Sequence, residues 1–316
     1  MLTRPRVAGM LAGYGADLVF GDPRRGHPVA GFGAAAAALE RFTYRDDRIA
    51  GALHTGLLVG MLSLLGALLQ RAARRRGPLW SAVSTATATW IALGGTSLLR
   101  VAEAMTELLE RGEVETARRL LPSLCGRDPA VLDGPGLTRA TLESVAENTC
   151  DAQVGPLLWA AVGGMPAVLA YRGINTLDAM IGHRSPRYAR FGWAAARLDD
   201  AANYVAARVT AALAVLSAPL VGGSPSAAVR VWRRDAARHP SPNAGVVEAA
   251  FAGALDVQLG GPTQYHHELQ IRPTLGDGRP PSVTDLRRAV LLSRAVQTAT
   301  LVACGTVVTA AGRSGR

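Results

Sequence analysis

Hydrophobic residues are concentrated in six stretches of the chain, which polar segments of unequal length separate. The most continuous stretch, residues 51–70, carries no formal charge and has the roughly 20 residues that a helix needs to cross a bilayer. Arginines flank it on both sides. We predict that the stretches are helical, and the candidate membrane segments are residues 7–20, 51–70, 79–99, 154–171, 203–222 and 290–311.

Two neighbouring stretches predict a helical hairpin. Residues 79–99 follow residues 51–70 after the short connection 71–78, and the Gly, Ala, Ser and Thr residues of both stretches suit close helix packing in lipid. The connection is rich in arginine, so the positive-inside rule places it in the cytoplasm. Strict alternation of six spans would then place the long polar segments on the opposite side, and the two assignments stay open.

Two other stretches are weaker as membrane helices. Residues 154–171 contain Pro156, Pro166 and a Gly-Gly pair, which predict a broken or re-entrant segment. Residues 7–20 resemble a signal peptide, but Asp17 interrupts them and no small-residue cleavage site follows, so we expect a retained helix.

The polar segments complete the fold prediction. Residues 100–150 mix charges with helical periodicity, which is typical of helices that face solvent on one side, and residues 223–289 are also polar. We therefore predict an all-α, polytopic helical membrane protein with about four to six membrane segments. Residues 1–316 would form a single integral-membrane domain, and polar helical loops would carry the active site.

Composition supports this class and excludes others. The chain is 49% hydrophobic but only 18% charged, whereas soluble domains usually carry about 25% charged residues. All 34 basic residues are arginine and the net charge is +10, yet the arginines are scattered and no nucleic-acid-binding motif accompanies them, so we predict no nucleic-acid partner. The three cysteines lie far apart, which argues against a disulfide framework or a zinc site.

An acidic stripe stands directly before the fourth hydrophobic stretch. Glu143, Glu147 and Asp151 are spaced by four residues and share a helix face, with Asn148 beside them. Like charges at this spacing repel one another, and Mg²⁺ bound by their oxygens would offset that repulsion. The alternative is a solvated acidic helix face, although no arginine is interleaved with the carboxylates.

Carboxylate, amide and guanidinium groups recur at helical spacing further along the chain. Such a combination on one face can hold Mg²⁺ together with a polyphosphate, and the alternative is a structural network of charge pairs. The first set is Arg172, Asn175 and Asp178, and the second is Arg197, Asp199, Asp200 and Asn203.

Two polar loops carry further candidates. Asp22 and His27 lie in a Pro-containing loop that could contact a metal or a phosphate, or could simply be a turn between helices. Asp277 and Arg279 lie in a Gly/Pro-rich loop near the C-terminal stretch.

A predicted helix start gives a last group of candidates. Asn243 occupies the position of an N-cap, where free N–H groups can bind phosphate, although an ordinary capped helix also explains it. His239 and Glu248 lie in the same segment. The histidine pair 266–267 lacks zinc-binding spacing.

Missing motifs narrow the chemistry. With no lysine, the chain has neither a Walker A motif nor a Schiff-base lysine, and it lacks the G-x-S-x-G motif of serine hydrolases. The acidic and amide-rich segments therefore favour metal–phosphate chemistry over acyl-serine hydrolysis.

Six blocks of the sequence stand out together. In order, they are "GDPRRGHPVAGFG", "ESVAENTCDAQVGPLLWAAVGG", "YRGINTLDAMIG", "FGWAAARLDDAANYVAARVTA", "HPSPNAGVVEAAFAGAL" and "LGDGRPP". Taken together, they resemble the CobD/CbiB family of membrane-bound adenosylcobinamide-phosphate synthases. The resemblance covers residues 9–295, and Cys150 and Gln153 depart mildly from the small or polar residues expected there.

The resemblance implies an enzyme of cobalamin biosynthesis in the bacterial inner membrane. Such a ligase joins the corrinoid adenosylcobyric acid to (R)-1-amino-2-propanol or its O-phosphate, using ATP and Mg²⁺. Membrane lipid, and other late enzymes of the pathway, are the expected partners.

On this reading the candidate residues take separate roles. Glu143, Glu147 and Asp151 would bind Mg²⁺, with Asp199 and Asp200 as a second acidic group. Arg172 and Arg197 would clamp phosphate, and His27 or His239 would deprotonate the attacking amine, since histidine titrates near neutral pH. The remaining candidates would bind substrate or ATP: Asp22, Asn148, Asn175, Asp178, Asn203, Asn243, Glu248, Asp277 and Arg279.

Two other functions stay open at this point. An Mg²⁺-dependent membrane transferase that acts on phosphorylated, lipid-like substrates would also use acidic clusters, but the spacing around residues 197–203 fits it only loosely. A corrinoid transporter or scaffold would need no ATP-site carboxylates.

Overall fold

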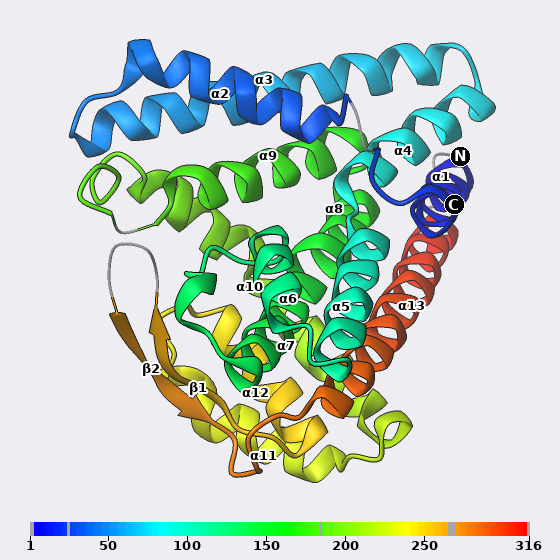
Figure 1. Cartoon of the computed structure of the whole chain (residues 1–316). Helices are drawn as coiled ribbons and strands as arrows, with labels where there is room; N and C mark the ends of the chain where they lie inside the picture. The colour runs from blue at the N-terminus through cyan, green and yellow to red at the C-terminus, as the bar shows by residue number, and fades with distance from the viewer. Residues whose placement is uncertain (1–2, 24–25, 184, 265–268, 315–316) are drawn as a thin grey trace. The chain divides into compact units, whose positions relative to one another are not determined.

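The computed structural model describes residues 3–23, 26–183, 185–264 and 269–314 (Figure 1). Within these residues it contains thirteen α-helices and one antiparallel two-stranded sheet, which confirms the all-α prediction. The chain divides into two compact units, each of which is built from segments that are not contiguous in the sequence. The first unit comprises Met1–Gly94, Asp151–Asn203 and Thr300–Arg316, and the second comprises Gly95–Cys150 and Tyr204–Ala299.

The first unit is built from apolar helices with well-defined ends. Asp47 caps the long helix α3 by accepting hydrogen bonds from the backbone N–H groups of Ile49 and Ala50, while prolines begin α2 and α4. α3 packs against α9. The helices that lie wholly in this unit are α1 (Thr3–Phe20), α2 (Pro28–Thr43), α3 (Arg48–Arg75), α4 (Pro78–Ala92), α8 (Gly155–Gly163) and α9 (Met165–Ile181).

Two glycines set the contact between α1 and α4. A Cβ atom on Gly9 would lie 2.6 Å from the Ala82 carbonyl oxygen, and one on Gly13 would lie 2.6 Å from that of Ala86. Only glycine therefore allows this backbone approach. The spacing of four residues is the small-residue pattern that brings helices together in lipid.

Replacement of Gly13 by leucine is expected to lower the free energy of unfolding by about 1–3 kcal/mol, because the new side chain has to force α1 away from α4. Thermal unfolding of the detergent-purified protein measures the loss. Gly15→Leu is the matched control, since a Cβ atom on Gly15 of the same helix meets nothing within 4 Å. Equal stability of the two variants would contradict the packing argument.

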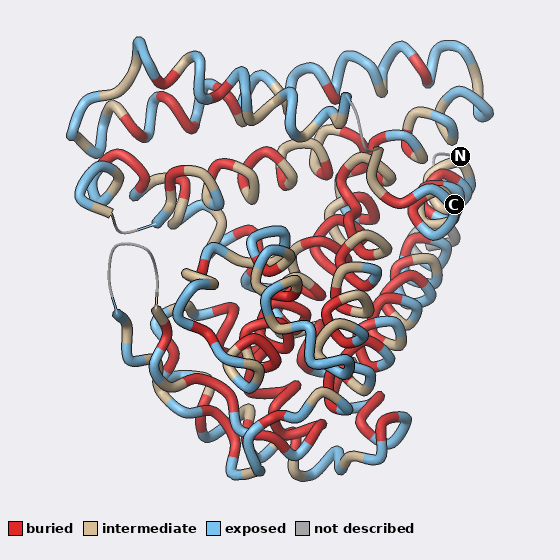
Figure 2. Tube along the Cα trace, viewed as in Figure 1, coloured by how far each residue is buried: buried red, intermediate tan, exposed pale blue. Residues whose placement is uncertain are grey.

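The second unit surrounds a fully buried helix. Every residue of α12 (Ala244–Leu255) is buried, which follows from a sequence that is apolar on almost all sides (Figure 2). β1 (Leu259–Gln264) pairs antiparallel with β2 (Leu269–Leu275), a small sheet that the hydrophobic pattern did not predict. The remaining helices are α5 (Gly95–Glu110), α6 (Val114–Leu120), α7 (Gly134–Thr149) and α11 (Pro225–Asp235).

Two long helices contribute residues to both units. They are α10 (Trp193–Ser217) and α13 (Val283–Ser314). Directly after α7, a π-helical turn, Cys150–Val154, precedes α8, and the division between the units falls at its start.

Three helices of the described residues are long and apolar enough to cross a membrane: Arg48–Arg75, Trp193–Val221 and Val283–Ala310. They contain nearly all of the predicted segments 51–70, 203–222 and 290–311. Residues 7–20 lie within α1, which does not meet the same criteria.

The other two predicted segments are interrupted. The prediction of one helix over 79–99 is wrong, because α4 ends at Ala92 and α5 begins at Gly95. α4 alone is shorter than the roughly 20 residues of a straight span. The break expected within 154–171 is confirmed at Gly164, whose φ of 69° favours glycine.

Candidate functional site

The second unit holds a buried carboxylate at its centre. Glu248 lies in the middle of α12 and its side chain is 1% exposed. Neither of its oxygens accepts a hydrogen bond from any described residue. Among the described residues, the nearest basic atoms are Arg272 Nη1, at 3.7 Å from Oε1, and His239 Nε2, at 3.9 Å, both too far for a hydrogen bond.

This environment disfavours the charged form of Glu248. Burial raises its pKa well above the usual range, the charges of Glu143 and Glu147 raise it further, and Arg272 opposes the shift. A carboxyl group that is buried and poorly paired is a candidate for proton transfer.

His239 faces Glu248 in a fixed orientation. His239 Nδ1 lies 3.1 Å from the backbone N–H nitrogen of Ser241 and 3.3 Å from the carbonyl oxygen of the same residue, while Nε2 lies 3.9 Å from Glu248 Oε1. Gly245 lets α12 approach the ring, because a Cβ atom there would lie 2.4 Å from that of His239. Burial lowers the pKa of His239 to about 4, and the charge of Arg272 adds to this effect.

The pKa of His239 predicts a pH dependence of stability. Its value in the folded protein, about 4, lies below the value of about 6.5 in an unfolded chain, so the unfolded state binds the proton first. The contribution of the neutral ring is therefore complete above pH 6.5 or so and is lost as the pH falls toward 4. Chemical unfolding across this range should show a smaller loss for His239→Gln, and equal losses would contradict the buried neutral histidine.

Glu143 is occupied by protein partners. Its Oε2 pairs with Arg127, and its Oε1 accepts a hydrogen bond from the backbone N–H of Gly260 at 2.7 Å. Both side chains of the ion pair are buried. Removing one partner from such a pair is costly, so Glu143 has a structural role whether or not it also binds a metal.

The other residues of the acidic stripe have different surroundings. Glu147 is exposed, and the Asn148 amide donates to the carbonyl and hydroxyl oxygens of Ser144 in its own helix. Asp151 belongs to the first unit.

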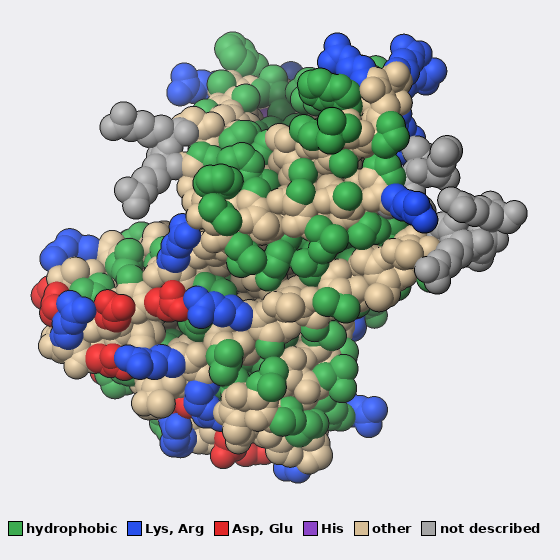
Figure 3. Space-filling view, turned by 90° about the vertical axis from the view of Figure 1, so that its right-hand side faces the viewer, with side chains coloured by type: hydrophobic (Ala, Val, Ile, Leu, Met, Phe, Trp, Pro, Cys, Tyr) green, Lys and Arg blue, Asp and Glu red, His purple; other side chains and the backbone are tan. Residues whose placement is uncertain are grey.

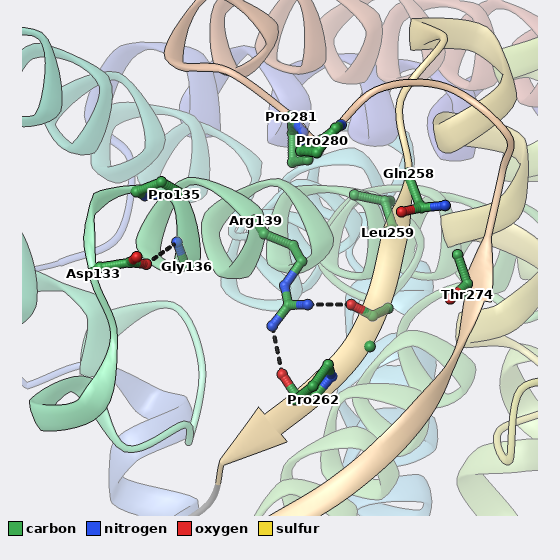
Figure 4. A pocket seen from close by; sticks show the side chains of 12 residues that line it. Asp133, Pro135, Gly136, Arg139, Gln258, Leu259, Pro262, Thr274, Pro280 and Pro281 are labelled. Atoms are coloured by element: carbon green, nitrogen blue, oxygen red, sulfur yellow. Dashed lines mark hydrogen bonds between the residues drawn. The ribbon is translucent and has the colours of Figure 1, made fainter.

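An open groove of about 520 Å³ lies between the start of α7 and the strands (Figure 4). Arg139 crosses it and donates to the carbonyl oxygens of Gly260 and Pro262, the latter at 2.5 Å. Asp133 caps α7 by accepting from the N–H of Gly136 at 2.8 Å. The volume falls in the range of pockets that hold small ligands.

Asn243 occupies the N-cap position of α12, but its side chain makes no capping hydrogen bond. Its Oδ1 accepts from Arg208 Nη1 at 2.8 Å, while Ser241 Oγ accepts from the N–H of Ala244 at 3.1 Å. The predicted N-cap position of Asn243 is therefore confirmed, but the side chain that accepts a hydrogen bond from the start of the helix is that of Ser241.

Asp277 and Arg279 face different partners. Asp277 pairs with Arg234 at 2.5 Å, and Arg279 pairs with Asp285 at 2.6 Å. Both side chains are largely exposed, and the contacts are ion pairs that hold the loop. Residues 265–268, including the histidine pair, lie outside the described residues.

The first unit brings two half-buried carboxylates together through an amide. Asn175 Nδ2 lies 3.3 Å from Asp151 Oδ2 and 3.4 Å from Asp199 Oδ1. Asn203 Nδ2 donates to Asp199 Oδ2 at 3.0 Å. The side chains come from the π-helical turn, α9 and α10, so the fold joins three sequence blocks that spacing could only treat separately.

Tyr171 holds this network in place. Its hydroxyl oxygen lies 2.7 Å from Asn203 Oδ1 and 2.9 Å from the backbone carbonyl of Asp151. The residue is fully buried, and Gly155 leaves room for its ring, because a Cβ atom there would lie 2.1 Å from the hydroxyl oxygen. Sequence reasoning missed Tyr171, since a buried tyrosine gives no pattern in the sequence.

Arg172 is the charged residue nearest to this network on α9. Its Nη1 donates to Asn175 Oδ1 at 3.2 Å, while its Nε is buried and donates to no described residue. Asp178 lies one turn further along α9. All three predicted residues therefore lie on one helix at three-residue spacing.

Two other predicted groups form local pairs. Arg197 is 62% exposed and pairs with Asp200 at 3.2 Å, a surface interaction of small energy. His27 Nε2 lies 3.5 Å from Asp22 Oδ1, and His27 Nδ1 caps α2 by accepting from the N–H of Val29.

Within the described residues, no three His, Cys, Asp or Glu side chains come together as a preformed metal site. The closest arrangement in chemical terms is Asp151 and Asp199, joined by Asn175. The two carboxylates are ligands that Mg²⁺ accepts, with water completing its coordination, whereas Asn175 presents its Nδ2–H group to both of them. Arg127, Arg139 and Arg272 were not among the predicted residues, because only the fold shows that they meet the acidic groups.

Comparison with known proteins gives the family. Residues 10–293 match the family model described as CobD/Cbib protein. The "Cobalamin biosynthesis protein CobD" of Mycobacterium tuberculosis strain H37Rv is 74% identical over 92% of both chains. Proteins of the same name are 43% identical in Geobacter metallireducens, over 84% of this chain and 85% of the relative, and 39% identical in Rhodobacter capsulatus, over 91% and 93%. No solved structure matches. The chain belongs to the CobD/CbiB family.

Proposed function

We propose that this protein is a cobalamin-biosynthesis enzyme that joins adenosylcobyric acid to (R)-1-amino-2-propanol or its O-phosphate through an amide bond, at the expense of ATP. Family membership and the printed names of its relatives support the pathway. The observation that carries the chemistry is the buried Glu248 beside a neutral His239. Amide formation from an ammonium group requires a proton acceptor in such a place.

The reaction needs an activated carboxyl group. A carboxylate oxygen of the corrinoid attacks the terminal phosphorus of ATP, which gives an acyl phosphate and ADP. The amine then attacks the acyl carbon, the C–O bond to phosphate breaks, and the amine gives up a proton. The products are the amide, ADP and inorganic phosphate.

We assign the acceptance of the proton to Glu248 rather than His239. The sequence-based choice of His239 rested on titration near neutral pH, but burial lowers its pKa to about 4 and its Nδ1 already accepts a hydrogen bond. Glu248 has a raised pKa, so its ionised form is a stronger base than an ordinary carboxylate. A bound ammonium group would favour this ionised form, the resting carboxyl proton would leave to solvent, and the carboxylate would then accept the proton from the amine. His239 Nε2–H would orient Glu248 by donating to it.

Asp151 and Asp199 are the residues that fit a divalent cation best in the first unit. Both carboxylates approach the same amide, and an ion between them would take the place of the Asn175 N–H contacts. Bound Mg²⁺ would neutralise charge on the phosphates of ATP. Glu143 already has two protein partners, so in this proposal it holds Arg127, while Glu147 and Asp200 stay predicted ligands.

The proposed location is the bacterial inner membrane, with α3, α10 and α13 as spans. Their length and apolar composition support this placement. Lipid is then a necessary partner, and neighbouring late enzymes of the pathway are candidate partners because the corrinoid must be passed on.

Turnover with and without ATP tests this function. The purified protein is mixed with adenosylcobyric acid, the amine and Mg²⁺, and the amide is measured by mass spectrometry. We expect product only when ATP is present. A transporter or scaffold would form no product in either case, and a lipid-phosphate transferase would act on phosphorylated lipid-like alcohols instead.

A further inference from the structure

Four arginines gather where α3 ends and turns into α4. Arg71, Arg74, Arg75 and Arg76 are all exposed. In the part of the chain that the structure describes, none of the four makes an ion pair or a side-chain hydrogen bond. Arg76 has an aromatic neighbour, since its guanidinium lies 5.8 Å from the ring centre of Trp80.

Several exposed arginines elsewhere in the chain have acidic partners. Arg187 pairs with Glu40, Arg287 with Glu110 and Arg294 with Glu103, each at 2.7 Å. The α3–α4 turn has no such neighbour in sequence either, because residues 48–102 contain no aspartate or glutamate. Its positive charge is therefore left for a ligand outside the chain.

The position of the turn indicates the nature of that ligand. Large apolar side chains of α3, among them Leu53, Leu57 and Leu64, are exposed along the helix that leads to it. The stretch from Ile49 to Leu69 is about 30 Å long at 1.5 Å per residue, which equals the thickness of the hydrocarbon layer of a bilayer. Figure 3 shows how extensively apolar side chains reach the surface on one face, with basic side chains beside them.

The arginines follow directly after this apolar length, so a membrane-spanning α3 would place them at the depth where lipid head groups begin. Trp80 is half exposed and lies beside Arg76, and tryptophan is enriched at the same interface. Positive charge here complements anionic phosphate groups, each basic residue near a charged bilayer surface adding to the attraction.

We propose that the α3–α4 turn binds the phosphate head groups of anionic phospholipids through Arg71, Arg74, Arg75 and Arg76. The turn would anchor the first unit to the cytoplasmic leaflet, in agreement with the positive-inside rule. This inference rests on the proposed membrane location of α3 and is independent of the proposed chemistry.

Retention of lipid during purification tests the proposal. The protein is reconstituted in vesicles that contain equal amounts of phosphatidylglycerol and phosphatidylcholine, extracted in neutral detergent, and its retained lipid is measured by mass spectrometry. We expect enrichment of phosphatidylglycerol. Conversion of all four arginines to glutamine should abolish the enrichment. Each arginine lost should lower the binding constant for phosphatidylglycerol by about fivefold.

Matched variants separate charge from folding. Replacing the four arginines by lysine keeps the charge and should keep most of the phosphatidylglycerol enrichment. This result would also show that a turn with four substitutions still allows α3 to insert into the membrane. Replacing the paired arginines Arg111, Arg187, Arg287 and Arg294 by glutamine removes the same number of charges and should leave it unchanged.

Three results would overturn the proposal. The glutamine variant could retain phosphatidylglycerol as well as the wild type, or the enrichment could survive a rise in ionic strength from about 0.1 to about 1 M, which screens surface charges. Displacement of the lipid by glycerol phosphate at equal concentration would show a site for free phosphate instead of a bilayer surface. Amide synthesis is not needed for any of these measurements, so a failure of the proposed function leaves the test intact.

Discussion

Replacement of Glu248 by glutamine is expected to lower the rate of amide formation by about 10²–10⁴-fold, the usual contribution of a positioned acid–base group. Glutamine has nearly the same shape as the neutral carboxyl group that burial favours, but it cannot accept a proton from the amine. The rate of the acyl-transfer step under saturating ATP measures the effect. Glu107→Gln, on the exposed face of α5, is the control and should keep wild-type activity.

The same variant has a stability readout that does not depend on catalysis. The pKa of Glu248 is raised in the folded protein, so its neutral form contributes fully below about pH 4.5, and the contribution is lost as the pH rises through the raised value. Glu248→Gln should remove this loss and be the more stable protein at alkaline pH. A variant with full activity would contradict the assignment, and an unchanged pH profile of unfolding would contradict the buried neutral carboxyl group.

Replacement of Asp199 by asparagine is expected to lower turnover by at least about 10²-fold, as loss of a charge-stabilising group in a phosphoryl-transfer site usually does. Asp199 and Asp151 approach the same Asn175 amide, and the change removes one of the two negative charges that would hold a divalent cation there. The Mg²⁺ concentration that gives half-maximal turnover should be higher for this variant than for the wild type.

A binding measurement keeps this prediction separate from folding. Mn²⁺ can replace Mg²⁺ as a spectroscopic probe, and we expect Asp199→Asn to bind it more weakly than the wild type. Asp46→Asn, in an exposed loop of the same unit, should bind it normally. Unchanged Mn²⁺ affinity of Asp199→Asn would move the metal elsewhere, with Glu147 and Asp200 as the remaining predicted ligands.

Much of the helical architecture follows from the sequence because it depends on local composition. Residues 51–70 are apolar throughout, and the helix α3 extends beyond them in both directions. The break at Gly164 also follows from local chemistry, since a Gly-Gly pair and nearby prolines disfavour a continuous helix. The interruption of 79–99 falls at the pair Gly94-Gly95, but no proline lies in that run, so the prediction treated the run as continuous.

The candidate site was predictable in its residue types but not in its pairings. The i, i+4 spacing placed Glu143 with Glu147 and Asp151, whereas the fold pairs Glu143 with Arg127 and with the backbone of Gly260. Such partners lie far apart in sequence, and no helical period reveals them. Burial is equally non-local, since the low pKa of His239 depends on the packing of α12 around it.

The polar network of the first unit shows the same limit. Asp151, Asn175 and Asp199 each belonged to a different motif, and the spacing within a motif could not show that they converge. Tyr171, which fixes their positions, has no feature in the sequence that separates it from an ordinary core aromatic residue.

The central claim is that ATP activates the corrinoid carboxylate as an acyl phosphate before the amine attacks. The fate of one carboxylate oxygen atom tests this claim most directly. Adenosylcobyric acid labelled with ¹⁸O in its reactive carboxylate is converted by the purified protein in the presence of ATP, Mg²⁺ and the amine, and the inorganic phosphate is examined by mass spectrometry. Activation through an acyl phosphate predicts one ¹⁸O atom in the phosphate for every amide bond formed. Amide formation that proceeds without ATP, or that yields unlabelled phosphate, would contradict it.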